Sequence, residues 1–465
     1  MEAEDPRDKR IAELLEVVER LTARVVELEA QVAALLRNST NSSKPPSSDP
    51  PAVARPPKSP SGKKRGGQPG HKGHQRRLLP VEEVDQVVKL VPDHCDGCGK
   101  TGCLTPLSDP PLRSQVIEVP PIKPTVTEHQ RFAATCSECG ATTVAPLPAG
   151  VPRGAFGPRL AAMLAVCTAK YRMSKRAVRE LLSDFLGVEL CLGSVANVEQ
   201  QVSVVLAGPF EEARAHIKAA PVVHADETSW RENKAKAWLW VAATPLVSVF
   251  LVATARSGKV AKELLGEAFA GILVTDRWSA YRFVEAVRRQ VCWAHLRRYF
   301  QGWVDGGGEG VRFGKALLAE VKRMFKWWRK VRDGTMPLAD FQKKVRKVQT
   351  SVGAVLSTAA ECSTKGVAGM ATEILKLETA LWNFVTEPGV EPTNNFGERT
   401  IRHAVIWRKG CFGTDSTDGS RFVERMLTTV ATLRQQQRNV LEFITQACQA
   451  QLMHTAPPSL LPPQG

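Results

Sequence analysis

Two aspartates each follow a short apolar run that is typical of a buried strand. Asp226 follows the run in PVVHADETSW, residues 221–230, and Asp276 follows the run in GILVTDRWSAY, residues 271–281. Two such strands can lie side by side in one sheet, with both carboxylates at the same edge. The sequence therefore predicts a pair of neighbouring carboxylates at the edge of a sheet.

A third carboxylate is expected from a later helix packed on that sheet. Glu398 lies just inside the helix predicted after Pro392, in EPTNNFGERTIRHAVIWRKGCFGT. Three converging carboxylates repel one another unless a cation joins them. Two Mg²⁺ ions, or Mn²⁺ in their place, would satisfy Asp226, Asp276 and Glu398 and would clamp both oxygens of an in-line phosphoryl displacement. The basic residues around Glu398 are expected to contact DNA, and they are Arg399, Arg402, Arg408 and Lys409.

Each acid also has a purely structural alternative. Asp226 could cap a turn, and Asp276 could cap the helix predicted near Ser279. Glu398 could complete a capping box with Asn395 or pair with a basic residue one turn further on. The three acids and their basic surroundings together favour a catalytic site over three separate caps.

The segments around these acids predict the fold. AWLWVAATPLVSVFLVATA, residues 237–255, carries no charge but has Pro245 at its centre, which favours two buried strands joined by a turn over a membrane helix. A helix is predicted in SGKVAKELLGEAF, residues 257–269. The resulting order, strand–strand–strand–helix–strand, is that of a ribonuclease-H-like catalytic core in a multidomain α/β protein.

Two Cys-x-x-Cys motifs, each followed by glycine, have the spacing of a structural zinc site. The chain has eleven cysteines and opens on a charged helical segment rather than a secretory signal, which favours thiols or metal sites over disulfides. The strand-like segments SQVIEV and TVTEHQRF favour a zinc-ribbon-like domain over residues 81–150, with His94 and Cys103 as alternative ligands. The four expected zinc ligands are Cys95, Cys98, Cys136 and Cys139.

A heptad pattern predicts a coiled coil over residues 1–38. β-branched residues at one core position with leucine at the other favour a parallel two-stranded coil, and therefore a homodimer. Arg24 and Glu29 could pair between the two chains. The alternative is a single amphipathic helix that packs on its own domain. The core positions are Ile11, Val18, Val25 and Val32, and Leu14, Leu21, Leu28 and Leu35.

Residues 39–80 are rich in serine, proline, glycine and basic residues and cannot build a hydrophobic core. The whole chain has 63 Lys and Arg against 47 Asp and Glu, a net charge of +16 that favours DNA as a partner. The segment is expected to neutralise phosphates or, alternatively, to serve only as a solvated linker. The residues expected to contact DNA are Lys63, Lys64, Arg65, Lys72, Arg76 and Arg77.

Residues 151–218 predict a helical domain. Ser174 and Ser194 are expected to be N-caps, and Gly187 is expected to end the first helix of a helix-turn-helix-like pair. A small helical bundle without a DNA-binding role would show the same caps. The side chains that could touch DNA are Asn197, Gln200 and Gln201.

The rest of the chain divides around the predicted core. Residues 301–390 predict a helical insertion, in which Trp327 and Trp328 could stack on unpaired bases or pack in a core. Cys292 and His295 form a Cys-x-x-His motif that could shape the site or simply be packed. The other predicted parts are the first and last parts of the core, 219–300 and 391–436, and a C-terminal helix with a proline-rich tail, 437–465.

Several blocks of the sequence resemble the transposases of the insertion sequence 66 family. They are HADETSW, VTDRWSAY, CWAHLRRYF and EPTNNFGERTIR in that order, with NSSKPPSSD and GGQPGHKG before them, the two Cys-x-x-Cys motifs, and PPSLLP at the end. The resemblance implies a catalytic Asp-Asp-Glu triad at Asp226, Asp276 and Glu398. It also implies a DNA transposase that cuts the ends of its element and joins the freed 3′-hydroxyls to target DNA, aided by accessory proteins of the same element. Gly397 departs from the family pattern, which has alanine there.

Two other functions fit the same residues. A transposase-derived regulator would bind DNA without cutting it, and a metal-dependent nuclease would cut DNA without joining it. Each of the three functions places the protein in the cytoplasm, at the nucleoid, with no membrane partner.

Overall fold

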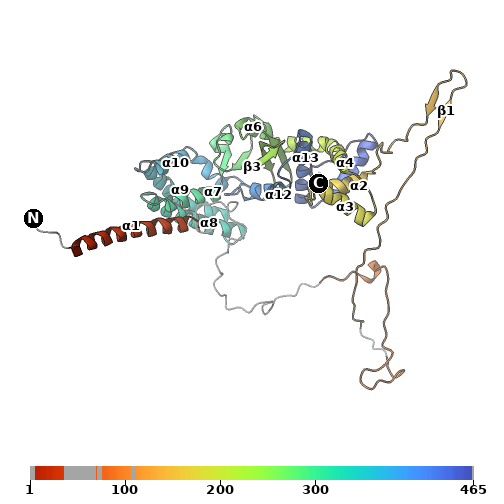
Figure 1. Ribbon diagram of the computed structural model, residues 1–465, viewed down its shortest axis with the longest axis horizontal. Helices are drawn as coiled ribbons and strands as arrows, with labels where there is room; N and C mark the ends of the chain where they lie inside the picture. Colours follow the sequence, from red (N-terminus) through yellow and green to blue (C-terminus); the bar gives the residue numbers. More distant parts are fainter. Residues whose placement is uncertain (1–5, 36–69, 71–75, 106–109, 463–465) are drawn as a thin grey trace, which may run out of the picture. The chain divides into compact units, whose positions relative to one another are not determined.

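The computed structural model describes residues 6–35, 70, 76–105 and 110–462, and the chain divides into two units. One unit comprises residues 54–123, and the other comprises the rest of the chain, which holds the sheet and most of the helices (Figure 1). Four of the residues predicted to contact DNA lie outside the described residues, namely Lys63, Lys64, Arg65 and Lys72.

The N-terminal heptad segment forms one helix, α1 (Pro6–Leu35). All eight residues at its predicted core positions are exposed. Arg24 forms an ion pair with Glu27 on its own helix. A continuous stripe of exposed branched apolar residues is the surface that a helix presents when it pairs with another helix.

The predicted zinc-ribbon-like region contains one short hairpin among its described residues, β1 (Ala133–Thr135) and β2 (Thr142–Val144). The prediction of strands at SQVIEV and TVTEHQRF is wrong, because neither segment belongs to a strand. Val116 is 90% exposed and Val126 is 89% exposed, so no neighbouring surface buries the apolar side of either segment. Alternation alone does not make a strand, which also needs a hydrogen-bonded partner.

Four helices, α2 to α5, directly precede the central sheet in the described part of the chain. Ser174 caps the second of them, since its Oγ accepts the Ala177 N–H at 3.1 Å, and Gly187 ends that helix in the left-handed conformation, as predicted. The predicted N-cap at Ser194 is wrong: Cys191 caps the next helix, and its Sγ accepts the Ser194 N–H at 3.4 Å. The helices are α2 (Pro158–Ala169), α3 (Lys175–Leu186), α4 (Leu192–Val205) and α5 (Ala207–Ala219).

Five strands form the central sheet in the order β5-β4-β3-β6-β7. The pairs β3–β4 and β4–β5 are antiparallel, whereas β3–β6 and β6–β7 are parallel. The uncharged stretch around Pro245 forms two strands joined by a turn, and a helix, α6 (Gly258–Leu265), follows them, so both predictions are confirmed. The strands are β3 (Val222–Glu232), β4 (Ala235–Ala243), β5 (Ser248–Ala253), β6 (Ile272–Thr275) and β7 (Arg289–Val291).

Helix α13 (Thr417–Gln435) covers the outer edge of β5. Side chains at every fourth helical position accept hydrogen bonds from alternate backbone N–H groups of the strand. Four helical residues rise about 6 Å and two strand residues about 6.7 Å, so the two repeats stay in step over three bonds. The donors and acceptors are Val252 to Glu424 at 2.7 Å, Phe250 to Thr428 at 3.0 Å and Ser248 to Thr432 at 3.0 Å.

The sheet shares one hydrophobic core with the helices that come before it from α2 onward and with the last helices of the chain. α2 packs against α14 (Val440–Leu452), and α4 packs against α13. Helix α12 (Asn395–Cys411) packs on β3 and β4. The core of the sheet is therefore closed by segments that lie far apart in the sequence.

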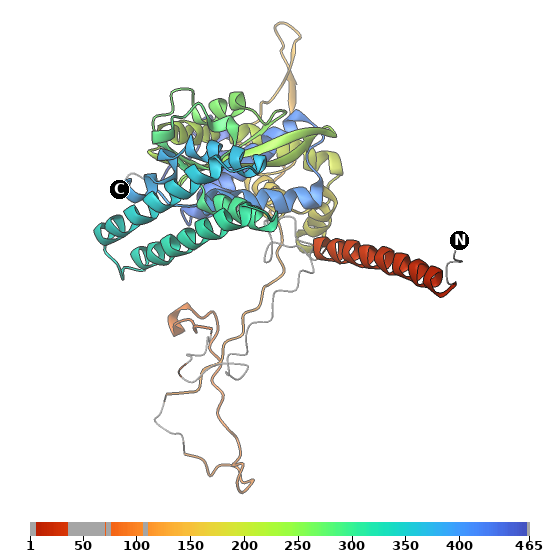
Figure 2. The ribbon, with the colours of Figure 1, turned by 90° about the vertical axis from the view of Figure 1, so that its left-hand side faces the viewer.

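The region predicted as a helical insertion builds a second core. Figure 2 shows its two long helices, α8 and α9, lying side by side. Trp328 packs against this core: its Nε1 donates to Glu391 at 3.1 Å, and its ring packs on Phe341 and Phe384. Trp327 is half-buried against the same core. The helices are α7 (Trp293–Asp305), α8 (Gly310–Arg332), α9 (Leu338–Ala360), α10 (Lys365–Leu375) and α11 (Asn383–Thr386).

Candidate active site

Asp226 and Asp276 lie at the same level of the sheet. The parallel pairing of β3 with β6 runs as far as His224 opposite Val274. Each aspartate comes two residues after that last pair, so the two carboxylates continue the same register past the end of β6. The structure thus brings together two residues that are 50 positions apart in the sequence.

Each aspartate also accepts a local backbone hydrogen bond. Asp226 Oδ1 accepts the Glu227 N–H at 2.9 Å, and Asp276 Oδ1 accepts the Trp278 N–H at 2.9 Å. The turn-capping alternative is therefore part of the structure, but it uses only one oxygen of each carboxylate. These bonds fix the direction in which each carboxylate points.

Glu398 reaches the two aspartates from the first turn of α12. The pKa of Asp226 is raised well above its usual range, first by burial and then by repulsion from Glu227, Asp276 and Glu398. Burial also raises the pKa of Glu398. The positive charge of Arg298 lowers this pKa, and the negative charge of Asp276 raises it further. The charge of Glu398 is therefore within electrostatic reach of both aspartates.

Asn394 positions the start of α12 against the sheet. Its Nδ2 donates to the carbonyl of Ala225 at 2.7 Å, and its Oδ1 lies 3.1 Å from the Nδ1 of His224. Its backbone carbonyl accepts the Glu398 N–H at 3.0 Å. Asn394 is 1% exposed, so these bonds are shielded from water. The alternative capping box between Asn395 and Glu398 is absent, because Asn394 occupies the N-cap position and its side chain bonds β3 instead.

Gly397 leaves room for that side chain. A Cβ added at Gly397 would lie 2.8 Å from Asn394 Oδ1 and 3.1 Å from its Nδ2. The glycine that replaces the alanine of the family pattern therefore gives the Asn394 side chain the space it occupies.

Glu227, next to Asp226, is engaged by other side chains. Its Oε1 accepts two hydrogen bonds from Arg256, at 2.6 and 2.9 Å, and its Oε2 accepts one from Tyr281 at 2.5 Å. The guanidinium of Arg256 also lies over the ring of Trp278, 4.0 Å from its centroid. Both oxygens of Glu227 are occupied, so this carboxylate supports the site without facing a substrate.

A buried cation lies behind the carboxylates. Arg289, 1% exposed in β7, donates to the carbonyl of Asp276 at 3.3 Å and lies 3.5 Å from Thr275 Oγ1. Burial lowers the pKa of Arg289 to about 10, while the charge of Asp276 opposes that shift. The side chain therefore stays protonated at neutral pH and offsets part of the negative charge of the site.

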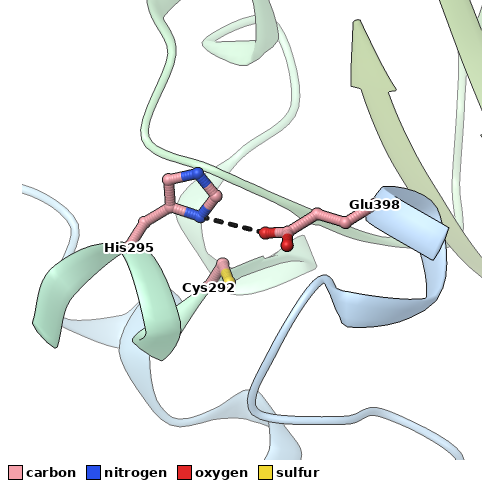
Figure 3. A group of neighbouring side chains, drawn as sticks. All are labelled: Cys292, His295 and Glu398. Atoms are coloured by element: carbon pink, nitrogen blue, oxygen red, sulfur yellow. Dashed lines mark ion pairs between the residues drawn. The ribbon is translucent and has the colours of Figure 1, made fainter. Parts of the chain in front are cut away.

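Cys292 and His295 lie beside Glu398 at the start of α7 (Figure 3). His295 Nδ1 is 3.5 Å from Glu398 Oε1. Burial lowers the pKa of His295 to about 4 and raises the pKa of the Cys292 thiol to about 11, so both side chains are neutral near pH 7. The sequence left open whether this Cys-x-x-His motif is only packed or shapes the site. In the structure, its His295 lies at the edge of the site.

The donor set suits a divalent cation that prefers oxygen ligands. Asp226, Asp276 and Glu398 are carboxylates that repel one another, and Glu398 Oε1 is buried with no hydrogen-bond partner. An unpaired buried carboxylate oxygen is costly unless a cation or a proton satisfies it. The residues present therefore fit the Mg²⁺ or Mn²⁺ that the sequence predicts.

The two Cys-x-x-Cys motifs have the same local fold in their separate units. In each motif, the backbone N–H of the first cysteine donates to the backbone carbonyl of the residue five positions later. Cys95 donates to Lys100, and Cys136 donates to Ala141. Backbone hydrogen bonds from the following turn lower the pKa of both thiols. The largest effect on Cys95 comes from the backbone of Cys98, and the largest effect on Cys136 comes from the backbone of Cys139. A thiol with a lowered pKa is readily deprotonated, as a zinc ligand must be.

Residues 153–421, more than half of the chain, match the family described as "Transposase IS66 family". The protein belongs to this family. Residues 92–140 match the zinc-finger binding domain of transposase IS66, and residues 3–77 match a family of unknown function. These matches confirm the resemblance seen in the sequence.

Two similar proteins come from Sinorhizobium fredii (strain NBRC 101917 / NGR234), and both are described as uncharacterized. The protein y4hP is 25% identical over 401 residues, which cover 76% of this chain and 69% of y4hP. The protein y4qI is 25% identical over 425 residues, which cover 82% of this chain and 74% of y4qI. The similarity to each relative spans most of both chains.

The predicted DNA-contacting residues of α12 in this IS66-family chain divide into two groups. Arg399, Arg402 and Lys409 are exposed. Arg408 instead reaches β3, where it donates to Thr228 Oγ1 at 3.0 Å and to the hydroxyl of Ser229 at 2.6 Å. Arg408 therefore ties α12 to the sheet.

The other predicted DNA-contacting residues that the structure describes lie on α4 and in the unit of residues 54–123. Asn197 and Gln200 are exposed on α4 and line a cavity of about 990 Å³, together with residues 147–156 and the end of α14. Arg76 and Arg77 are exposed, and Arg76 donates to the carbonyl of Gln115 at 2.7 Å. No described helix is both long and apolar enough to span a membrane.

Sequence reasoning missed the residues that support the three acids. Asn394, Arg256 and Arg289 stand far from Asp226 in the sequence and carry no pattern of spacing that connects them to it. For Asn394 there was one usable signal, since it lies within the quoted block EPTNNFGERTIR, four residues before Glu398.

Proposed function

We propose that this IS66-family protein is a DNA transposase that cleaves the ends of an insertion element and joins the freed 3′-hydroxyls to target DNA. The observation that carries the proposal is that Asp226 and Asp276 continue the register of the parallel strands β3 and β6, with Glu398 of α12 within electrostatic reach of both. The match to the transposase family over residues 153–421 covers all three acids.

The core that carries these acids is, on this proposal, ribonuclease-H-like. Three antiparallel strands followed by two parallel ones, in the order β5-β4-β3-β6-β7, support that assignment. Helix α12, which packs on β3 and β4, supplies the third acid.

Asp226, Asp276 and Glu398 would hold two Mg²⁺ ions, or Mn²⁺ in their place. When bound, the cations supply the Lewis acidity that activates the attacking oxygen and stabilises the leaving oxygen. Asn394 holds Glu398 toward the aspartates, and Arg256 with Tyr281 fixes Glu227 beside Asp226. Arg289 reduces the net repulsion at Asp276.

The remaining parts are assigned to DNA recognition and assembly. Cys95, Cys98, Cys136 and Cys139 would bind one structural Zn²⁺. The exposed residues Arg399, Arg402 and Lys409 would contact the phosphates of DNA near the cut. Helix α1 would pair in parallel with α1 of a second copy, which suits a reaction that must hold two element ends. Accessory proteins of the same element would complete the complex at the nucleoid.

The test uses labelled DNA that carries the element ends flanking this gene, with Mg²⁺ or Mn²⁺ and any neighbouring accessory proteins. Wild type is compared with Asp276→Asn and with Asp415→Asn, a control at an exposed acid after α12. We expect metal-dependent joined products from wild type and Asp415→Asn, and at least a 100-fold loss in Asp276→Asn.

Other results would indicate the alternative functions. Cleavage without joined products would indicate a nuclease. Tight binding of the ends without any cleavage, accessory proteins included, would indicate a DNA-binding regulator.

A further inference from the structure

The starts of α7 and α12 are joined by two hydrogen bonds. Trp293 donates its N–H to the carbonyl of Pro392 at 2.9 Å, and Asn394 donates its N–H to Cys292 Sγ at 3.1 Å. This arrangement brings His295 and Glu398 face to face (Figure 3). Cys292, His295 and Glu398 offer ligand atoms that all lie within 4.8 Å of one another.

Two of these atoms are buried and have no hydrogen-bond partner: His295 Nδ1 and Glu398 Oε1. They face each other across 3.5 Å, which exceeds the 2.7–3.2 Å of a good hydrogen bond. A buried polar atom without a partner is costly, so such atoms usually mark a place where a ligand or ion is bound. Both atoms are therefore available to bind a third atom.

The gap fits a cation that both atoms bind. Two ligands about 2.1 Å from one metal ion are about 3.0 Å apart at adjacent octahedral positions and about 3.4 Å apart at tetrahedral ones, so a small side-chain movement would bring both atoms onto one ion. The Cys292 sulfur already accepts the Asn394 N–H and completes the packing of the site. His295 and Glu398 are thus the pair that is free to bind.

We propose that His295 supplies a nitrogen ligand to the cation that Glu398 binds, and that this ligand makes the site prefer Mn²⁺ to Mg²⁺. The inference rests on the proposed function, because it concerns the same cation site. Mg²⁺ requires octahedral coordination by oxygen and gives up its water reluctantly, whereas an imidazole nitrogen favours a first-row transition metal. Among the divalent first-row transition metals, Mn²⁺ generally binds nitrogen and oxygen ligands most weakly. A site that still prefers Mn²⁺ to Mg²⁺ is therefore a strict test for a nitrogen ligand.

The test measures metal binding rather than activity. Full-length, zinc-loaded protein is titrated with Mn²⁺ and with Mg²⁺ by calorimetry, and the bound Mn²⁺ is studied by pulsed electron paramagnetic resonance. A directly bound imidazole nitrogen modulates the Mn²⁺ signal, and ¹⁵N-labelling of histidine shifts that modulation. This reading is made on wild type and does not depend on how well a variant folds.

The variants are His295→Gln and, as a control, His403→Gln at an exposed histidine of α12. We expect wild type and His403→Gln to bind Mn²⁺ about tenfold more tightly than Mg²⁺ and to show the nitrogen modulation. His295→Gln should lose the modulation and about tenfold in Mn²⁺ affinity, while its Mg²⁺ affinity stays within about twofold.

Different failures identify different errors. Mn²⁺ that binds wild type without nitrogen modulation, or equally well in His295→Gln, would overturn the role of His295 and leave the three carboxylates as the metal site. Binding that Asp276→Asn does not weaken, or no binding of either metal, would overturn the proposed active site as well.

Discussion

At the residue scale, the position of Glu398 depends on a neighbour that cannot itself do chemistry. Asn394 bonds β3 with its side chain, Cys292 with its N–H and Glu398 with its carbonyl. One buried amide therefore connects three of the elements that make up the site. Its neighbour Asn395 is exposed and provides a matched comparison.

Asn394→Ala should weaken both the fold and the site. It leaves the buried carbonyl of Ala225 without its donor, so we expect the free energy of unfolding to fall by about 1–3 kcal/mol. DNA cleavage should fall by at least about tenfold, because Glu398 is no longer held toward the aspartates. Denaturant unfolding and the cleavage assay check these values. Asn395→Ala should change neither, and equal effects of the two variants would contradict the role of Asn394.

Asp226 makes the stability of the cation-free protein depend on pH. Its raised pKa means that the folded state binds more protons than the unfolded state between the unfolded pKa of about 3.9 and the folded value. The stability that this group contributes is therefore fully present below the unfolded pKa and is lost as the pH rises through the folded pKa.

Asp226→Asn removes this loss. Without added Mg²⁺ or Mn²⁺, we expect the variant to melt at least about 2 °C above wild type at pH 7, with a smaller difference at lower pH. Added cation should raise the melting temperature of wild type and leave that of the variant unchanged. Calorimetry across pH checks this, with Asp415→Asn expected to follow wild type. A variant that melts below wild type at pH 7 without cation would refute the argument.

The three acids were predictable from local patterns, although the strand end expected at Asp226 is wrong: Asp276 directly follows β6 and Glu398 lies in the first turn of α12, whereas β3 continues past Asp226 to Glu232. An apolar run that stops at Asp226 or Asp276 carries its own signal, and Glu398 follows a proline that starts a helix. Their supporting residues were not predictable in this way. Arg289 lies in a three-residue strand, and its burial depends on β6 and α11 packing beside it, which no local pattern shows.

At the element scale, α13 acts on β5 through side chains that are polar and yet fully buried. Thr428 and Thr429 are adjacent buried threonines of this helix with different surroundings. Thr428 Oγ1 accepts the Phe250 N–H at 3.0 Å, whereas Thr429 Oγ1 has no hydrogen-bond partner. Thr429 is thus a matched control for the hydrogen bond between Phe250 and Thr428.

Thr428→Val should lower the free energy of unfolding by about 1–3 kcal/mol, because valine keeps the shape of threonine and leaves the Phe250 N–H unsatisfied. Thr429→Val should be neutral or stabilising, since it removes an unpaired buried hydroxyl. Urea unfolding of both variants measures the difference. If Thr428→Val proves no more harmful than Thr429→Val, the edge bonds contribute little to stability.

Elements were predicted best where one segment carries the whole signal. The turn at Pro245 and the left-handed stop at Gly187 depend on one residue each, and both are present. The cap at Ser194 was wrong because a cysteine thiol three residues earlier takes the role of a hydroxyl. The expected strands near Val116 and Val126 failed because a strand depends on a partner elsewhere in the chain.

At the scale of the whole molecule, α1 is the element whose apolar surface has no burial within the described chain. Leu21 occupies a predicted core position in the middle of the helix, and Ala23 lies on the opposite face. The two positions allow the seam and the outer surface to be changed separately.

Leu21→Glu should convert a homodimer into a monomer, because it places a charge in the apolar seam. Light scattering should give wild type about twice the chain mass of 50.8 kDa and the variant one chain mass. Ala23→Glu should remain dimeric. A wild-type protein that is monomeric at micromolar concentration would refute dimerisation through α1.

The long separation of the three acids also governs when the site can exist during synthesis. Glu398 follows Asp276 by 122 positions, which a ribosome at about 5–20 residues per second needs about 6–24 s to add. The last helices, α13 and α14, must then emerge before α2 and α4 have their packing partners. A chain that terminates early therefore lacks both the third carboxylate and a closed core. Nonsense or frameshift copies of this gene would yield inert, protease-sensitive fragments rather than an enzyme that damages the chromosome while half made.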